Sequence, residues 1–303
     1  MQKEITPHQS GLLQVSKLHK INYAAFGNPK GIPLLSFHGG PGGKFKSKYA
    51  AMMDLEKYYV IMFDQRGCGG SLPAGEIKEN TTNDIPSDAE KLLNHLKVKK
   101  CVVTGLSWGS TLALAFAEKY PTRTISLIIG LVFVLLKNYN SEWFLGDGLR
   151  NIFPQEYDEL MSVIKTKNAK ELFRKFESAG AQKKKEITAA IQTWESVQMK
   201  GLNPIAAKSA DEIEDADICA YRIFLHYTAN DYFGIGNSIM KNIGKLNGIP
   251  VRIIHGEFDF SCPMSMAWDL KKKLQGADFT AVPYEGHGGR MITELFFRTV
   301  NQC

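Results

Sequence analysis

The chain has 303 residues, of which 44% are hydrophobic and 22% are charged. This apolar content and the mixture of both charges exclude an intrinsically disordered protein, and the length suits either two domains or one core with a large insertion. The net charge of +6 is small, and the lysine clusters at 97–100, 183–185 and 271–273 contain no interleaved aromatic residues. We interpret these clusters as solvated surfaces and expect no nucleic-acid partner.

Five scattered cysteines lack the CxxC spacing of a zinc site. They are typical of reduced thiols, which favours a cytoplasmic location. No apolar signal segment is recognisable near the N-terminus. The longest apolar stretch, residues 125–136, is shorter than the roughly 20 residues that span a bilayer, so we interpret it as a buried strand running into a loop and expect no membrane partner.

Short apolar runs alternate with helical stretches in the first part of the chain. The pattern predicts strands at 33–37, 58–63, 101–104 and 127–129, and helices at 84–96 and 111–120. A polar, lysine-bearing helical block follows, and the alternation then resumes with a strand at 251–254, a helix at 264–274 and a strand at 279–282. We therefore predict an α/β fold with a mostly parallel sheet flanked by helices. Residues 1–133 and 241–303 would form the core, and residues 134–240 a helical cap over the carboxyl ends of the strands.

The motif Gly105-Leu-Ser-Trp-Gly109 lies between a predicted strand and a predicted helix. A serine at such a sharp turn has strained backbone geometry, so its neighbours two positions away must be small. The following helix directs its positive N-terminal end at the serine, which favours a developing oxyanion. The motif therefore predicts Ser107 as a nucleophile.

A serine nucleophile needs a base and an acid that orients the base, and in this architecture they follow in the order acid, then histidine. His287 lies in a glycine-bounded loop after the last predicted strand, whereas His255 lies within a strand and His38 begins another loop. We predict His287 as the base. The segment after the strand at 251–254 offers two acids, of which we prefer Asp259, with Glu257 as the alternative.

Two further motifs follow predicted strands. The glycine-rich segment His38-Gly-Gly-Pro-Gly-Gly43 would bring a backbone N–H of Gly39 or Gly40 to the substrate carbonyl, and together with the N–H of Trp108 it would form an oxyanion hole. No G-K-[ST] follows in register, which argues against a phosphate-binding loop.

The segment Phe63-Asp-Gln-Arg-Gly67 is a polar turn, in which we expect Arg66 and Asp64 to pair and hold the loops around the site.

Together these motifs resemble the proline iminopeptidase family of α/β-hydrolases. The resemblance covers most of the chain. It rests on HGGPGG at 38–43, DQRGCG at 64–69, NTT at 80–82 with Asp84 and Asp88, SWGSTLALAFA at 107–117, Phe153-Pro154, Trp194-Glu195, GEFDFSCP at 256–263 and GHGG at 286–289. The family removes N-terminal proline from peptides without a metal, so the resemblance implies a small proline-containing peptide as substrate and no cofactor.

The resemblance also implies roles for individual residues. Ser107, Asp259 and His287 match the catalytic triad. Glu195, in the Trp194-Glu195 pair of the cap, matches a glutamate that binds the free amino terminus of the substrate, and a closed site needs such a carboxylate because an unpaired ammonium is costly to bury. Phe133 and Phe144 match apolar walls around the proline ring, and we expect Trp194 to take part in substrate binding with Glu195.

The chain departs from the family pattern at the second amine-binding glutamate. Phe224 stands where that acid is expected, in Arg222-Ile-Phe-Leu-His-Tyr227. Glu142 and Asp231 are the cap acids that we consider as replacements. The loss of one carboxylate suggests an alternative function, a hydrolase of small esters or amides that does not need a free amine. A non-catalytic binding protein is disfavoured because all three triad residues are present in the expected order.

Overall fold

The computed structural model describes residues 5–135, 139–199 and 208–303. Within these residues the core is an eight-stranded sheet in the order β1-β2-β4-β3-β5-β6-β7-β8. β1 and β2 are antiparallel to their neighbours, and the strands from β4 to β8 run parallel. The strands are β1 (Gln9–Gln14), β2 (Lys20–Gly27), β3 (Ile32–Phe37), β4 (Tyr58–Phe63), β5 (Cys101–Leu106), β6 (Thr124–Gly130), β7 (Val251–Gly256) and β8 (Asp278–Val282).

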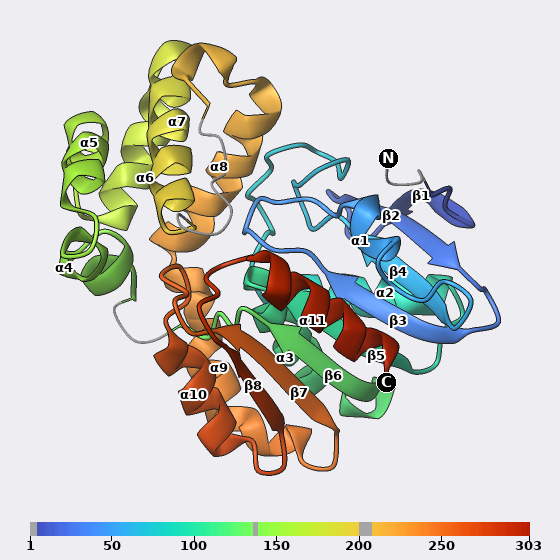
Figure 1. Cartoon of the computed structure of the whole chain (residues 1–303). Helices are drawn as coiled ribbons and strands as arrows, with labels where there is room; N and C mark the ends of the chain where they lie inside the picture. Colours follow the sequence, from blue (N-terminus) through green and yellow to red (C-terminus); the bar gives the residue numbers. More distant parts are fainter. Residues whose placement is uncertain (1–4, 136–138, 200–207) are drawn as a thin grey trace.

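Helices cover both faces of this sheet (Figure 1). The central strands are apolar on both sides, so consecutive residues such as Leu34 and Leu35 enter different hydrophobic layers. One layer packs under α1 (Ser47–Ala50) and α11 (Arg290–Asn301). The other packs under helices that include α2 (Asp84–His95), α3 (Trp108–Lys119), α9 (Ile235–Asn242) and α10 (Met264–Lys273). The predicted α/β fold is confirmed.

The chain between β6 and β7 carries a group of helices that stands apart from the sheet (Figure 1). They are α4 (Asp147–Arg150), α5 (Pro154–Ile164), α6 (Ala169–Ser178), α7 (Ala181–Val197) and α8 (Asp215–Ala229), preceded by the π-helical turn η2 (Tyr139–Phe144). Within the group α5 packs on α7, and α6 packs on α8. Their apolar residues join the same hydrophobic cluster as α3, which places the group above the end of the sheet where Ser107 lies.

The division into core and cap stays a proposal, and the packing refines its second boundary. The predicted cap runs to residue 240, but α9 packs against α3 of the core, where Ile235 and Ile239 are buried. We propose that the core resumes at α9, after the short turn η4 (Asp231–Gly234).

Candidate active site

Ser107 lies in the tight turn between β5 and α3. Its backbone has φ 58° and ψ −129°, a strained conformation for a residue with a side chain. A Cβ at Gly105 would lie 2.1 Å from the carbonyl oxygen of Gly109, and a Cβ at Gly109 would lie 2.3 Å from that of Phe37. The turn therefore requires glycine at both positions, as the motif predicts.

The structure brings the three predicted catalytic residues together. The Ser107 hydroxyl lies 3.0 Å from Nε2 of His287, and Nδ1 of His287 lies 2.7 Å from Oδ2 of Asp259. The other oxygen of Asp259 accepts a hydrogen bond of 2.7 Å from the backbone N–H of Cys262, which fixes the orientation of the carboxylate. This geometry is that of a nucleophile, a base and an acid that orients the base.

The environment of this relay favours a serine nucleophile. Burial lowers the pKa of His287, but the charge and hydrogen bond of Asp259 and the charge of Glu195 outweigh it and hold that pKa above its usual value. Cys262 lines the same cavity, and burial with the nearby Asp259 charge raises the pKa of its thiol well above its usual value. Cys262 therefore stays a thiol, which is a weak nucleophile.

Asp259, Cys262 and His287 also place possible metal-ligand atoms within 4.8 Å of one another. Nδ1 of His287 is already bonded to Asp259, so we interpret the group as part of the relay.

Two other residues that the sequence offers as base or acid are not part of the Ser107–His287–Asp259 relay. His255 is buried, with Nδ1 accepting from the N–H of Val132 at 2.9 Å and Nε2 lying 2.8 Å from the carbonyl of Cys262. It therefore ties the loop after β6 to the loop after β7. Glu257, the alternative acid, is exposed.

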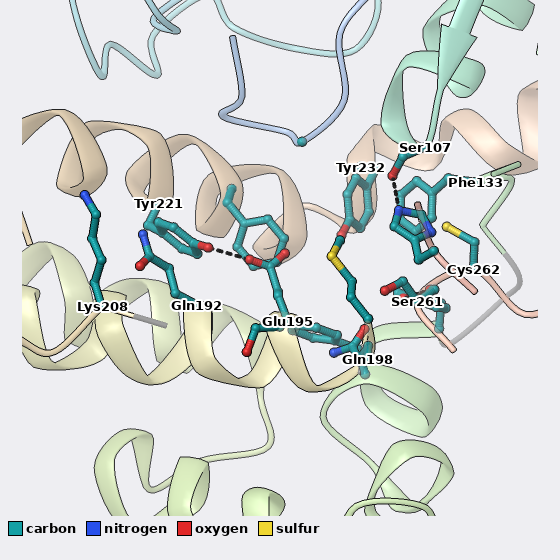
Figure 2. A pocket seen from close by; sticks show the side chains of 17 residues that line it. Ser107, Phe133, Gln192, Glu195, Gln198, Lys208, Tyr221, Tyr232, Ser261 and Cys262 are labelled. Carbon is teal, nitrogen blue, oxygen red and sulfur yellow. Dashed lines mark hydrogen bonds between the residues drawn. The ribbon is translucent and has the colours of Figure 1, made fainter. Parts of the chain in front are cut away.

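A cavity of about 370 Å³ extends from Ser107 into the cap (Figure 2). Ser107 and Lys208 lie at its opposite ends, with Glu195 and Tyr221 between them. Aromatic residues from both core and cap line this cavity: Phe133, Tyr139, Phe144, Tyr221, Phe224 and Tyr232. Phe133 and Phe144 thus lie where an apolar wall was predicted.

Glu195 is the single carboxylate among the described residues that line this cavity. It extends from α7 and accepts a hydrogen bond of 2.5 Å from the hydroxyl of Tyr221 on α8. Burial raises the pKa of Glu195 to about 7, although this hydrogen bond and the charge of His287 oppose the shift. Burial and the Glu195 charge raise the pKa of Tyr221 well above its usual value, so its hydroxyl stays a donor.

Trp194 does not line the cavity, contrary to its predicted place in substrate binding. Its side chain is buried, and its indole N–H donates to the carbonyl of Phe144 at 3.0 Å. Trp194 therefore supports the wall residue Phe144 from behind. Neither Glu142 nor Asp231 is among the lining residues, so neither replaces the missing second carboxylate. Phe224 occupies the wall there and packs against Phe144 with ring centroids 5.9 Å apart.

The predicted oxyanion loop is tied to α3 by a residue that the sequence analysis overlooked. The side chain of Gln65 donates to the carbonyl of His38 at 2.9 Å and accepts from the indole N–H of Trp108 at 3.0 Å. Its backbone N–H donates to Nε2 of His38 at 3.0 Å. Gln65 thus fixes the Gly39–Gly40 segment relative to the first residue of α3, whose backbone N–H has no acceptor within the helix.

The predicted Arg66–Asp64 pair is wrong. The Arg66 guanidinium instead forms two hydrogen bonds with buried Asp88, at 2.6 and 2.8 Å, and lies 3.3 Å from Asp84. Asp64 instead accepts from the N–H of Gly70 in its own turn at 2.9 Å and from the N–H of Phe45, in the segment before α1, at 2.8 Å. The expectation that this segment holds the loops is retained, with different partners.

The Asn80 motif connects core and cap. The amide of Asn80 donates to the carbonyl of Arg66 at 2.9 Å, and its oxygen accepts from the hydroxyl of Tyr227 on α8 at 2.8 Å. Thr82 donates to the carbonyl of Tyr232, which lines the cavity, at 2.9 Å. The Arg66 network therefore extends to the wall of the site.

The loop that carries His287 ends at Gly289 for a steric reason. A Cβ at Gly289 would lie 1.5 Å from Oε2 of buried Glu285. The other oxygen of Glu285 accepts from the N–H of Met291 at 3.1 Å, in the first turn of α11. Glycine fits at position 289 because the buried Glu285 carboxylate occupies the space that a side chain would need.

Comparisons with known proteins identify the family. Residues 32–289 match the model of the α/β-hydrolase fold. The chain is 38% identical to a probable proline iminopeptidase of Leptolyngbya boryana, with 93% of this chain and 89% of the relative covered. It is 34% identical to a proline iminopeptidase of Arabidopsis thaliana, with 93% of this chain and 76% of the relative covered. A haloalkane dehalogenase variant from Bradyrhizobium elkanii shares the fold, with a TM-score of 0.64, 15% identity, and coverage of 97% of this chain and 95% of that chain.

The described helices include none that is both long and apolar enough to cross a membrane. The sequence matches over nearly the whole chain agree with the resemblance seen in its motifs. The chain belongs to the proline iminopeptidase family of α/β-hydrolases.

Proposed function

We propose that this protein is a serine aminopeptidase that releases N-terminal proline, or a similar small residue, from peptides through an acyl-enzyme. The observation that most supports this reaction is one cavity that contains the Ser107–His287–Asp259 relay and, farther in, the carboxylate of Glu195. The relay suits acyl transfer, and the carboxylate suits a substrate that carries a free amine next to the reacting carbonyl.

The reaction begins when Oγ of Ser107 attacks the prolyl carbonyl. Nε2 of His287 takes the hydroxyl proton, and Asp259 stabilises the imidazolium that forms. The backbone N–H of Trp108 and one from the Gly39–Gly40 segment bind the oxyanion, held in place by Gln65. When the tetrahedral intermediate collapses, the C–N bond breaks and His287 gives its proton to the leaving amine.

Deacylation repeats these steps with water as the nucleophile. His287 takes a proton from the water, and hydroxide adds to the acyl carbonyl. The C–O bond to Ser107 then breaks, and Oγ regains the proton from His287. Free proline leaves and the enzyme returns to its starting state.

The cap side of the cavity selects the residue that is released. The rings of Phe133, Phe144, Phe224 and Tyr232 surround a space suited to an apolar pyrrolidine. Beyond it, Glu195 would pair with the substrate ammonium, with Tyr221 holding the carboxylate in position. Glu195 is partly buried, so an occupant without a positive charge would leave the ionised carboxylate without a counter-charge, which is costly.

The hydrolysis of small esters or amides without a free amine remains the second candidate function. Phe224 favours it, because the described residues of the cavity offer one carboxylate where the family pattern has two. The two functions are separated by rates on a prolyl-anilide and on its N-acetylated form, in the native protein and in Glu195→Gln. The aminopeptidase predicts that acetylation lowers kcat/KM at least 100-fold in the native protein and far less in the variant. Equal rates on both compounds in the native protein would support the second function.

We also propose that the protein works in the cytoplasm. Its five cysteines are free, and Cys68, Cys101 and Cys262 are buried as thiols. Unpaired cysteines are typical of a reducing compartment. Cell fractionation with an antibody to this chain tests the location.

A further inference from the structure

A second cavity, of about 380 Å³, meets the first at the nucleophile. Gly40, Ser107, Met199 and His287 line both. The two cavities then separate into different layers of the protein. The aromatic wall of the first belongs to the hydrophobic layer that continues into the cap, whereas the wall of the second belongs to the layer between the sheet and helices α1 and α11.

We propose that this second cavity binds the part of the peptide that follows the scissile bond, and that it selects a large apolar second residue and a nearby terminal carboxylate. The inference rests on the proposed function. The reacting carbonyl has two substituents, the proline Cα and the leaving nitrogen, and they diverge from Ser107. If the proline ring and its amine occupy the cavity with Glu195, the leaving peptide needs the other space that opens at the same atoms.

The walls of the second cavity suit an apolar side chain. They consist largely of methionine, leucine and aromatic residues: Phe45, Tyr49, Met53, Met62, Leu106, Leu131, Phe296 and Phe297. Methionine side chains adapt to occupants of different shape. A leucine side chain has three more carbons than alanine, and full burial of each carbon favours binding by about fourfold, from roughly 0.8 kcal/mol per methylene group. Partial burial in an open cavity would leave a preference of about tenfold.

The rim of the second cavity is positively charged. Lys44 and Lys46 line it, both are exposed, and neither forms an ion pair with any residue in the described ranges. The segment between them is anchored, because the N–H of Phe45 donates to Oδ1 of Asp64 at 2.8 Å. Partial desolvation and the neighbouring charges of Lys48 and Lys44 lower the pKa of Lys46, so an anion placed here would offset the repulsion among these lysines. The carboxylate at the end of a short peptide is such an anion.

Three dipeptide substrates test this assignment in the full-length protein. Prolyl-leucine, prolyl-alanine and prolyl-leucine amide are compared by the kcat/KM of proline release. Leucine and alanine are similarly basic as leaving amines, so a difference between the first two reports the apolar wall. We expect prolyl-leucine to exceed prolyl-alanine about tenfold, and to exceed its amide about three- to fivefold, the range for a partly exposed ion pair.

Lysine variants identify the residues that bind the terminal carboxylate of the peptide. Lys44→Gln/Lys46→Gln should bring prolyl-leucine down to the value of its amide. Lys48→Gln is the matched control. Lys48 belongs to the same segment, but it does not line the cavity and lies over the ring of Tyr49 at 5.5 Å. It should keep the preference for the free carboxylate.

The outcomes separate this inference from the proposed function. Equal kcat/KM on the three dipeptides would overturn the inference and leave the aminopeptidase intact. An equal loss in the Lys48 variant and the double variant would overturn the role given to the rim. The absence of proline release from every dipeptide and from a prolyl-anilide would instead overturn the proposed function.

Discussion

The hydroxyl of Tyr221 donates a hydrogen bond of 2.5 Å to Oε2 of Glu195, the one carboxylate among the described residues of the cap-side cavity. Phe224, one helical turn after Tyr221 on α8, fills the place where the family pattern has a second acid. The amine receptor that we propose for this protein is thus a carboxylate supported by a phenol. The phenol carries no charge, so it lowers the pKa of Glu195 without adding negative charge to the site.

Removal of the phenol hydroxyl should weaken substrate binding near neutral pH. The Tyr221 hydrogen bond lowers the pKa of Glu195, which burial raises to about 7. In Tyr221→Phe that pKa rises further, so less of Glu195 is ionised at pH 7 and KM for a prolyl-anilide increases, by up to about tenfold. The increase should diminish at pH 8.5, where Glu195 is ionised again.

Tyr232→Phe is the control for this change, since Tyr232 lines the same cavity and its hydroxyl is bonded only weakly, at 3.5 Å from Thr228. In Tyr232→Phe, KM for the prolyl-anilide should depend on pH as it does in the native protein. A KM in Tyr221→Phe that is native-like at pH 7 would contradict the role assigned to the phenol.

The pH dependence of kcat/KM should show two ionisations on its acid side. His287 must be neutral to accept the serine proton, and Glu195 must be charged to bind the amine. Their pKa values are both raised, that of Glu195 to about 7, so activity falls as the pH drops through this region. With both groups titrating, the logarithm of kcat/KM approaches a slope of two against pH. Glu195→Gln should reduce the slope to one, and a slope of two in that variant would show that Glu195 does not titrate in this range.

Gln65 is expected to act on kcat more than on KM. It connects the His38 carbonyl with the Trp108 indole, and so fixes the two segments that supply the oxyanion donors. Gln65→Met keeps the volume and removes both side-chain hydrogen bonds. We expect kcat to fall about 10- to 100-fold, less than the 100- to 1,000-fold typical for loss of an oxyanion donor itself. A thermal melt verifies that the variant is folded. Reduced affinity at unchanged kcat would contradict this positioning role.

Gly289 and Glu285 form a pair that a double variant can test. In Gly289→Ala the added methyl group would lie 1.5 Å from the Glu285 carboxylate, so either this buried side chain moves and loses its bond to the N–H of Met291, or the His287 loop shifts. We expect kcat to fall at least tenfold, because His287 lies two residues away. Adding Glu285→Ala removes the clash and should restore much of that loss. A double variant no more active than Gly289→Ala would show that the carboxylate is not the cause.

The catalytic relay was predictable because its residues have local signatures. Gly105 and Gly109 identify the turn at Ser107, and the order of the strands places Asp259 and His287 at the same end of a parallel sheet. Helix α11 and strand β2 were not predicted, although both have a recognisable pattern of apolar residues. Residues Ile292, Phe296, Phe297 and Val300 of α11 have helical spacing, and Ile21, Tyr23 and Ala25 of β2 alternate with other residues as in a strand.

The remaining contacts leave no such signal. Gln65 and Trp108 are 43 positions apart and meet only because the turn after β4 lies beside the first residue of α3. Tyr221 meets Glu195 across two cap helices, and a helical position facing a cavity has the same sequence pattern as one facing the core. The Arg66–Asp64 pairing was wrong because neighbours in a turn face different directions: the Arg66 side chain reaches α2, while Asp64 accepts from the N–H of Gly70 in its own turn and from that of Phe45. The second cavity gathers residues from six separate segments, which sequence spacing does not connect.

The most direct test of the central claim is to locate the covalent adduct formed by a prolyl phosphonate, which carries a free amine and reacts with an activated serine. After proteolysis, mass spectrometry identifies the modified residue. We predict a single adduct on Ser107, formed more slowly when Glu195 is changed to Gln. An adduct on Cys262, or native turnover of a prolyl-anilide by Ser107→Ala, would contradict the account.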